Sequence, residues 1–155
     1  MYETLLVPHA GTIAGDQALK HAIHIAKSDS SKIIILNVIK PWSNPFFEEL
    51  DYNDATTHVQ IESIMTNMQE TIRKFLAKRV SQCREEGVKC EGIFRTGNPA
   101  NSIIKYATEE NIDLIVMAKM KKKSNDYKSF FKIGGTVKKV QEKVDCSILL
   151  VETEN

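Results

Sequence analysis

The chain has 155 residues, about the length of one ordinary domain and enough to bury a proper core. Hydrophobic residues make up 42% of it and charged residues 26%, which is typical of a folded soluble protein and argues against global disorder. The formal net charge of +1 argues against a protein that binds nucleic acid with its whole surface, so any site for a polyanion must be local.

The sequence has no hallmark of a membrane or secreted protein. No apolar run reaches the roughly 18–20 residues that a membrane span needs, and residues 1–8 lack the basic and apolar regions of a signal peptide. Three scattered cysteines, Cys83, Cys90 and Cys146, form no C-x-x-C pair. They indicate reduced, buried thiols rather than a disulfide framework or a zinc site. We therefore expect a cytoplasmic protein.

Short β-rich runs alternate along the chain with longer stretches of helical periodicity. This alternation is typical of βαβ units built around a parallel sheet. In chain order the pattern predicts strand 4–7, helix 14–27, strand 32–39, loop 40–54, helix 55–86, strand 88–95, helix 99–110, strand 113–117, loop 119–132, helix 134–144 and strand 147–151. Neither an internal repeat nor a low-complexity linker interrupts this order. The sequence therefore predicts one α/β domain over residues 1–155.

Single residues mark where several of these elements begin and end. Gly87 is placed to end the long helix, as a glycine at a helix C-terminus does. Asn98 is placed to cap the next helix, and Pro99 suits its first turn. The run 32–39 is apolar almost throughout, which indicates a parallel strand buried on both faces. The half-polar run 88–95 instead suits a position near the edge of the sheet.

Right-handed crossovers and short connections leave few ways to arrange five such strands. The favoured arrangement is a doubly wound, five-stranded parallel sheet of order 3-2-1-4-5 with helices on both faces. Such a sheet has a crevice where the strand order reverses, here between the first and fourth strands, and ligands of this fold class bind outside the carboxyl ends of those strands. Segments 9–15 and 118–136 follow the two strands, so we expect them to form the binding site.

Several segments, in the right order and spacing, match one known family. They are Leu5-Leu6-Val7-Pro8-x-x-Gly11-Thr12, Ala18-Leu19-x-x-Ala22, Gly97-x-Pro99-Ala100, Asp113-Leu114-Ile115-Val116-Met117, Gly134-Gly135-Thr136 and Cys146-Ser147-Ile148-Leu149-Leu150-Val151. Together they run from Met1 to Glu152, and the chain resembles the universal stress proteins. The resemblance implies a homodimer formed through the last strand, whose apolar run of Ile148, Leu149, Leu150 and Val151 suits pairing across a sheet edge.

Members of this family that bind ATP carry Gly-x-x-Gly and, after a spacer, Gly-Ser or Gly-Thr. Glycines let phosphates approach main-chain amides, and a helix N-terminus attracts phosphate. Here Ala118 and Lys121 stand at the first two glycine positions, and the match at residues 134–136 follows a longer spacer. The position of an aspartate that contacts the nucleoside part of ATP holds Ala10.

The resemblance thus implies an adenine-nucleotide site that is partly degenerate. Its candidate residues are Val7, Pro8, Ala10, Gly11, Val38, Met117, Ala118, Lys121, Gly134, Gly135 and Thr136. We expect ATP or AMP to bind weakly or not at all. The Lys121 side chain either occludes the path of a phosphate or replaces a main-chain contact with positive charge.

Six lysines between residues 119 and 132 face a single acid, Asp126. Charge runs of this kind are usually solvated loops, which is the interpretation we prefer. The alternative is a site for a small anion, the phosphates of a nucleotide or a larger polyanion.

The histidines give little support to catalysis or metal binding. His9 lies in the predicted crevice, but no Ser, Cys or carboxylate at motif spacing partners it. His21 and His24 are three residues apart on one helix, and no further ligand accompanies them. Cys146 is expected to be a small buried hydrophobe. We expect no catalytic residue and no metal.

The leading hypothesis is a non-enzymatic regulatory or stress-response module that works as a homodimer. The alternative is a nucleotide-binding switch or slow ATP hydrolase, which keeps the helix start at residues 134–136 and replaces lost contacts with lysines. An adenylyl-transferring enzyme of related fold is disfavoured, because its histidine- or glycine-rich signatures are absent.

Overall fold

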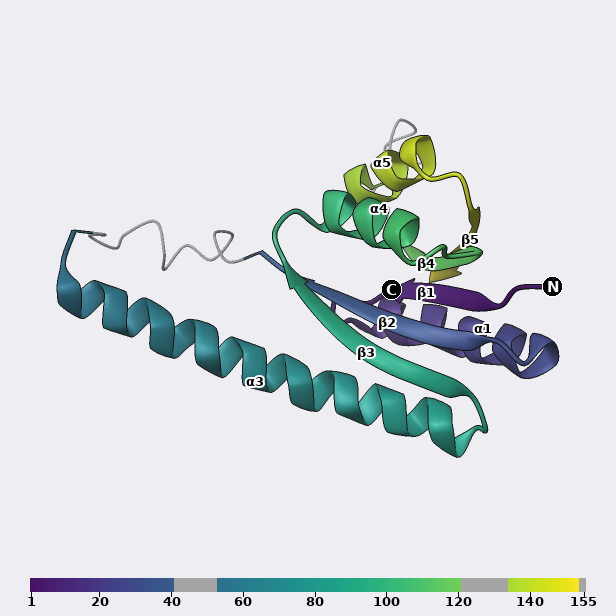
Figure 1. The fold of residues 1–155 in the computed structure, drawn as a ribbon, viewed down its shortest axis with the longest axis horizontal. Helices are drawn as coiled ribbons and strands as arrows, with labels where there is room; N and C mark the ends of the chain where they lie inside the picture. The colour runs from purple at the N-terminus through teal and green to yellow at the C-terminus, as the bar shows by residue number, and fades with distance from the viewer. Residues whose placement is uncertain (41–52, 121–133, 154–155) are drawn as a thin grey trace, which may run out of the picture.

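The computed structural model describes residues 1–40, 53–120 and 134–153. Five parallel strands form one sheet of order β3-β2-β1-β4-β5 (Figure 1). The strands are β1 (Thr4–Pro8), β2 (Lys32–Ile39), β3 (Lys89–Thr96), β4 (Leu114–Met120) and β5 (Ser147–Thr153). The helices are α1 (Ile13–Asp29), α3 (Ala55–Glu85), α4 (Pro99–Glu109) and α5 (Gly135–Lys143). The predicted doubly wound order is confirmed.

Each face of the sheet has its own hydrophobic core. Leu5, Val7 and Ile33 point to the face that α1 and α3 cover, whereas Leu6 and Ile34 point to the face that α4 and α5 cover (Figure 1). This division follows from the two-residue period of a strand. Because both faces are covered, β2 is apolar on both, as its sequence predicts. The half-polar β3 lies at an edge of the sheet, also as predicted.

The predicted helix boundaries are confirmed where local chemistry specifies them. The Asn98 side chain accepts a hydrogen bond from the Asn101 N–H, so it caps α4 with Pro99 following. Gly87, just after α3, has φ +79°, a conformation that a residue with a Cβ rarely adopts. The Thr12 hydroxyl caps α1 by accepting from the Gly15 N–H.

The fourth and fifth strands run further than the sequence pattern suggests. In the parallel pair, Lys119 of β4 lies opposite Glu152 of β5, and both strands continue for one more residue. Lys119 is therefore part of a strand and not of a loop, since a polar residue at the end of a strand near the sheet edge needs no buried partner. The rest of the predicted lysine-rich loop, Lys121 included, lies outside the described residues.

The helix α3 is longer than the strands it packs against. Its 31 residues span about 46 Å at 1.5 Å per residue, against roughly 26 Å for the eight residues of β3. The amino-terminal half therefore projects beyond the sheet (Figure 1). Leu76 and Cys83 in the second half are buried, but Val59 in the first half is 66% exposed. The apolar side chains of α3 are thus buried against the sheet only over part of the length of the helix.

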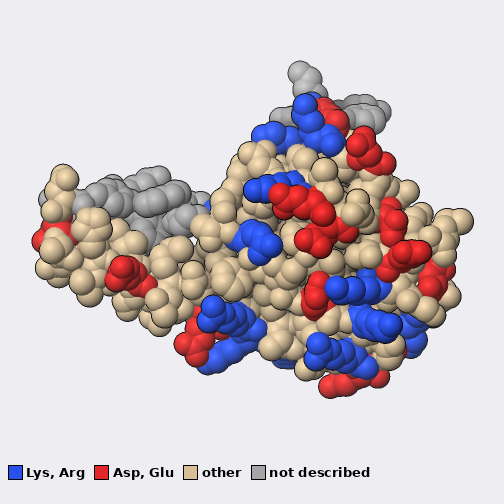
Figure 2. Space-filling view, viewed as in Figure 1, with Lys and Arg blue, Asp and Glu red and all other residues tan. Residues whose placement is uncertain are grey.

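Positive and negative side chains are interspersed over the face that α3, β3 and α4 form (Figure 2). This mixture is consistent with the formal net charge of +1. Among the described residues, no helix is both long enough and apolar enough to cross a membrane. Cys83, Cys90 and Cys146 are all free thiols, and Cys146 is half-buried rather than fully buried as expected.

One aspartate joins the amino ends of the two central strands, β1 and β4. Asp113 Oδ2 accepts hydrogen bonds from the main-chain N–H groups of Glu3 (3.0 Å) and Thr4 (2.9 Å). The Asp113 N–H in turn donates to the Thr4 carbonyl at 3.1 Å. The carboxylate thereby satisfies the N–H groups just before and at the start of β1, where β1 does not yet pair with β4.

We expect Asp113→Ala to lower the free energy of unfolding by about 1–3 kcal/mol, because two main-chain donors lose a charged acceptor. Urea unfolding measures this change. The matched control is Asp145→Ala, since Asp145 is exposed and makes no hydrogen bond with the described part of the chain. Equal stabilities of the two variants would contradict the anchoring role of Asp113.

Candidate functional site

The centre of the sheet opens where β1 and β4 stop pairing. The paired residues of these strands are Leu5 with Leu114 and Leu6 with Ile115. Beyond this point β1 continues to Pro8 and β4 to Met120. The strand order reverses here, so this is the position at which sheets of this class bind ligands.

The structure divides the candidate nucleotide-binding residues between the core and the surface. Val7 and Met117 are buried in opposite cores, so their side chains stabilise the sheet. The half-buried candidates are Pro8, Val38, Ala118 and Thr136. The exposed candidates are Ala10, Gly11, Gly134 and Gly135. The expectation for Lys121 lies outside the described residues. The half-buried and exposed candidates lie at the end of β1 and just after it, in the last three residues of β2 and β4, and at the start of α5.

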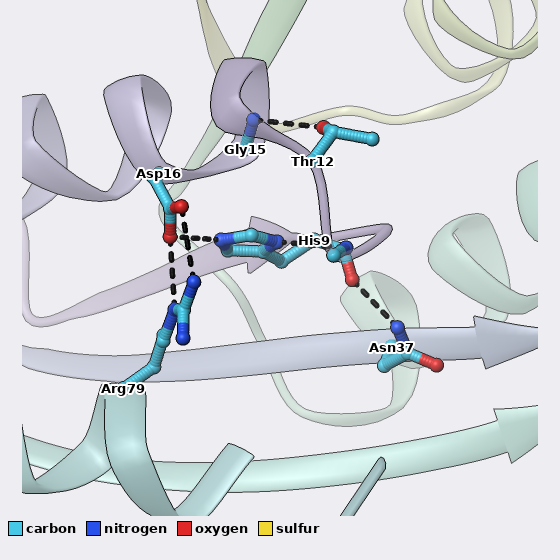
Figure 3. Close-up of polar contacts among 7 residues, drawn as sticks. His9, Thr12, Gly15, Asp16, Asn37 and Arg79 are labelled. Atoms are coloured by element: carbon cyan, nitrogen blue, oxygen red, sulfur yellow. Dashed lines mark hydrogen bonds and ion pairs between the residues drawn. The ribbon is translucent and has the colours of Figure 1, made fainter. Parts of the chain in front are cut away.

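The turn from β1 into α1 is fixed by hydrogen bonds at its first residue. The His9 N–H donates to the Leu36 carbonyl (2.9 Å), and the Asn37 side-chain amide donates to the His9 carbonyl (2.8 Å). Gly11 has φ +79°, and its N–H donates to His9 Nδ1 at 3.1 Å. The main chain of the crevice wall is therefore held to β2 on one side and to an imidazole on the other (Figure 3).

His9, Asp16 and Arg79 form a connected polar network beneath this turn (Figure 3). His9 Nε2 lies 3.0 Å from Asp16 Oδ1. Arg79 binds the same carboxylate with two hydrogen bonds, from Nε to Oδ1 at 2.9 Å and from Nη2 to Oδ2 at 3.0 Å. The paired geometry of an Arg and a carboxylate is among the stronger polar contacts in proteins. It joins α1 to α3.

Close packing holds the imidazole in place as well as hydrogen bonds do. The His9 side chain is 0% exposed. A Cβ at Gly15 would lie 2.5 Å from His9 Nδ1, so a glycine in the first turn of α1 is what makes room for the ring. On the other side, the Phe75 ring meets the imidazole edge-on, with 4.9 Å between ring centroids. The Arg79 guanidinium lies over that same phenyl ring.

The hydrogen bonds determine which nitrogen of His9 carries the proton. Nδ1 accepts from the Gly11 N–H, so it holds no proton, and Nε2–H donates to Asp16. Burial lowers the pKa of His9 below its ordinary value of 6.5, although the Asp16 carboxylate opposes this effect. Protonation at Nδ1 would also place two N–H groups against each other. His9 is therefore a neutral imidazole in the folded protein.

The Asp16 carboxylate, between the neutral imidazole of His9 and the Arg79 guanidinium, stays ionised. The hydrogen bonds from Arg79, and to a smaller degree the one from His9, lower the pKa of Asp16 below its ordinary value of 3.8. Asp16 is about one-third exposed and Arg79 less than one-fifth. The network therefore lies between the solvent and the buried ring, and it gives His9 a permanent acceptor.

The sequence contains no carboxylate at a catalytic motif spacing from His9, and the hydrogen-bonded partner Asp16 is not identified from it. Asp16 lies seven residues later, across a strand-to-helix turn, which is not a catalytic motif spacing. Thr12 and Gly15 could have given a signal. A helix cap at Thr12 places Asp16 in the first turn of a helix that begins close to His9. Gly15 in the same turn indicates close packing against a neighbouring group. Arg79, 63 residues further on, could not be found from sequence spacing.

This arrangement is suited to shaping a loop rather than to catalysis. Both ring nitrogens of His9 are engaged in hydrogen bonds, so the imidazole has no free lone pair to act as a general base. His21 and His24 are exposed. Within the described ranges, no cluster of three or more His, Cys, Asp or Glu side chains could hold a metal ion.

The start of α5 belongs to the second segment that the sequence predicts for the binding site, and it is exposed. Gly134 and Gly135 are exposed, and no side chain caps the first turn of the helix. Main-chain N–H groups at such a terminus favour a negatively charged partner. The predicted helix start at residues 134–136 is confirmed.

Comparison with known proteins points to one family. A sequence model described as the universal stress protein family matches residues 1–152. Universal stress protein YxiE of Bacillus subtilis is 26% identical over 157 residues, which cover 97% of this chain and 99% of that protein. Universal stress protein MJ0531 of Methanocaldococcus jannaschii is 26% identical over 152 residues, covering 98% of this chain and 83% of that protein.

Solved structures are similar over the whole fold. The structure of the hypothetical protein MJ0577 has a TM-score of 0.77 at 21% identity and covers 100% of this chain and 99% of that chain. A universal stress protein in complex with cAMP has a TM-score of 0.66 at 18% identity, covering 99% and 98%. A universal stress protein family protein from Arabidopsis thaliana with AMP bound has a TM-score of 0.64 at 16% identity, covering 98% and 92%. At these identities the likeness establishes the fold.

The neutral state of His9 makes a prediction about pH. Because the pKa of His9 is lower in the folded than in the unfolded protein, the unfolded chain binds the proton more tightly. The contribution of His9 is therefore present above pH 6.5 and is lost as the pH falls toward its folded pKa. Asp16 adds nothing in this window, because its lowered pKa matters only below its ordinary value. We expect urea midpoints to fall between pH 7.5 and 5.5.

The comparison variant is His9→Gln, which should show a smaller fall over the same pH interval whatever its absolute stability. His21→Gln removes an exposed histidine from the same part of the chain and should behave like the natural protein. A fall of equal size in His9→Gln and the natural protein would show that His9 is not the titrating group.

Proposed function

The chain belongs to the universal stress protein family, and we propose that it is a non-enzymatic regulatory module of the stress response. In this proposal it works as a homodimer and retains a degenerate crevice that binds adenine nucleotides weakly. The related structures with cAMP and with AMP give the ligand class. Cytoplasmic location is part of the same proposal, resting on the cysteine pattern and on the family.

The observation that carries the proposal is the exposed Ala10 at the crevice turn. The resemblance implies an aspartate there that contacts the nucleoside part of ATP, and a methyl group accepts no hydrogen bond. The loss of one charged acceptor costs about 1.5–3 kcal/mol, or roughly one to two orders of magnitude in affinity. The turn itself keeps its shape, because its hydrogen bonds come from His9 and Asn37.

The state of His9 supports a role without catalysis. This residue is the histidine of the crevice turn, and both of its ring nitrogens are used inside the protein. Its partner Asp16 is in turn held by Arg79 with two hydrogen bonds. Neither group could abstract a proton from a water molecule or a hydroxyl without breaking a contact on which the turn depends. The exposed start of α5 still offers main-chain N–H groups to a phosphate.

We expect calorimetry to give dissociation constants for ATP and AMP no tighter than about 10 μM, near −7 kcal/mol. Ala10→Asp should strengthen binding by about tenfold, because it restores an acceptor at an exposed position without burying a charge. Gln17→Glu is the matched control, since it adds the same charge on the side of α1 that faces α3.

Two results would contradict this part of the proposal. One is nanomolar ATP binding by the natural protein, and the other is release of phosphate from ATP that exceeds the rate in buffer. Mass spectrometry of the small molecules released when the purified protein is denatured checks for a nucleotide already bound. Phosphate release would favour the alternative of a slow hydrolase.

For the dimer we expect light scattering to give twice the chain mass at tens of micromolar. β5 is a sheet edge, and Ile148, Leu149 and Leu150 are each half-buried, so a second copy could cover more of them. Leu149→Asp should yield a monomer, because a charge buried without a partner is costly. Leu149→Thr, which keeps the strand uncharged, should remain a dimer. A monomeric natural protein at this concentration rules out the dimer.

A further inference from the structure

The open edge of β3 and the neighbouring face of α3 enclose a groove of about 610 Å³. Its lining is distinct from the crevice, which lies at the centre of the sheet. Three of the lining side chains are arginines, Arg73 and Arg84 from α3 and Arg95 from β3, and none of the lining residues is acidic. All three arginines are exposed. Within residues 1–40, 53–120 and 134–153, none of the three forms an ion pair.

The main chain of β3 presents half of its hydrogen-bonding groups to this groove. The register between β2 and β3 is unbroken from Lys89 to Thr96, and the Gly97 N–H continues it by donating to the Ile39 carbonyl. The main-chain N–H and C=O groups of the odd-numbered residues therefore point to β2, since these groups alternate sides along a strand. The main-chain groups of the even-numbered residues point to the open edge; these residues are Cys90, Gly92, Phe94 and Thr96.

Two arginines already bind outward-facing carbonyl groups. Arg84 Nη2 donates to the Cys90 carbonyl at 3.4 Å, and Arg95 Nη1 donates to the Phe94 carbonyl at 3.2 Å. A guanidinium group has five N–H donors, so each keeps others for a ligand. The outward N–H groups of Gly92 and Phe94 lie between the two arginines along the strand. The edge is therefore rich in donors and poor in acceptors.

The helix side of the groove matches the length of a short extended peptide. Arg73 and Arg84 are eleven residues apart, which places them about 16 Å apart along the helix axis. Ala77 and Ser81, small and exposed, lie between them in the groove wall. Side chains four positions apart on a strand point to the same face and lie about 13 Å apart, which is within a few ångströms of this spacing.

We propose that the groove between α3 and β3 binds an extended acidic peptide segment of a partner protein, which adds as a strand to the open edge of β3. The peptide main chain pairs with the outward groups of Gly92 and Phe94. Carboxylates four residues apart meet the arginines at the two ends. Charge complementarity selects the occupant, because an acceptor-rich, negatively charged strand satisfies donors that a neutral strand leaves unpaired.

Gly92 makes the edge accessible to such a strand. A Cβ at this position would lie 3.0 Å from the Leu76 Cβ, so glycine allows α3 to pack closely against the inner face of β3. The residue is nevertheless exposed, because its main-chain groups point to the open edge. The partner strand therefore meets bare backbone at the centre of the groove, with arginines on both sides.

The test uses the full chain and a fluorescein-labelled, acetylated heptapeptide with two glutamates four residues apart among threonines and valines. Fluorescence anisotropy should show saturable binding that weakens as salt is added. The double variant Arg73→Gln with Arg84→Gln should weaken it by roughly tenfold, or about 1.4 kcal/mol. Lys78→Gln is the matched control, since it removes one positive charge from α3 on the side that faces α1.

Two further probes separate strand addition from simple attraction of charge. A peptide with proline in place of its central residue keeps both glutamates but cannot complete the ladder, and it should bind at least about tenfold more weakly. In nitrogen-15 spectra, the amide signals of Gly92 and Phe94 should shift on addition of the first peptide. The circular dichroism of each variant checks that it folds.

Three results would overturn the proposal. They are equal binding of the proline peptide, an equal loss of affinity in Lys78→Gln, and tighter binding of a single-stranded oligonucleotide of the same charge. The oligonucleotide result would identify the groove as a nucleic-acid site instead. None of these measurements depends on the nucleotide crevice, so they stand whether or not that crevice binds ATP.

Discussion

The carboxylate of Asp16 connects three elements that the chain brings together from distant positions. It accepts the Nε2–H of His9 at the end of β1, lies in the first turn of α1, and takes two hydrogen bonds from Arg79 of α3. Each of the three side chains stabilises the state in which the next one binds its own partner. Arg79 keeps Asp16 ionised, the ionised Asp16 gives the buried imidazole an acceptor, and the imidazole accepts the Gly11 N–H. A buried polar network of this kind is stable only when every member is satisfied. The shape of the crevice turn therefore depends on a contact made by α3.

This dependence explains how the crevice turn can keep its form while the residue at position 10 differs from the family pattern. The turn is specified by His9, Gly11, Thr12 and Gly15, and these residues interact with one another through main-chain and ring contacts. Ala10 lies within the same turn, but its side chain is exposed. A change at Ala10 can therefore alter what the crevice binds without disturbing the fold. A change at Gly15 cannot, because any Cβ there collides with the imidazole.

The sequence predicts the sheet well because its signals are local and periodic. β2 is apolar on both faces, and Asn98-Pro99 specifies a helix start by capping alone. The end of β4 is missed because Lys119 looks like loop, whereas its strand conformation is set by pairing with β5, 33 residues later. The projection of the first half of α3 beyond the sheet is also missed, since periodicity shows which residues share a face but not whether the sheet is long enough to cover it. For the crevice, resemblance supplies candidate positions. The Asp16–Arg79 contact could not be predicted from spacing, because it joins residues that meet only when both helices pack on one face of the sheet.

The arginines of α3 lie on different sides of one helix, which allows their roles to be separated. At 100° per residue, Arg79 is about 120–140° away from the side that bears Arg73 and Arg84, and the buried Leu76 lies between these directions. Arg79 faces α1 and is committed to Asp16, whereas Arg73 and Arg84 line the groove beside β3 without a carboxylate partner in the described part of the chain. An arginine that only interacts with solvent could lie on any exposed turn of α3, so the position of Arg73 and Arg84 beside β3 is informative. Both arginines flank small residues on the side that borders an unpaired strand edge, and Arg84 binds a carbonyl of that edge. Such edges are otherwise open to pairing with any strand. Arg84 and Arg95 bind main-chain carbonyl groups of the β3 edge, and the main-chain N–H groups between them stay open. In the proposed interaction, the β3 edge therefore prefers an acidic strand over a neutral one.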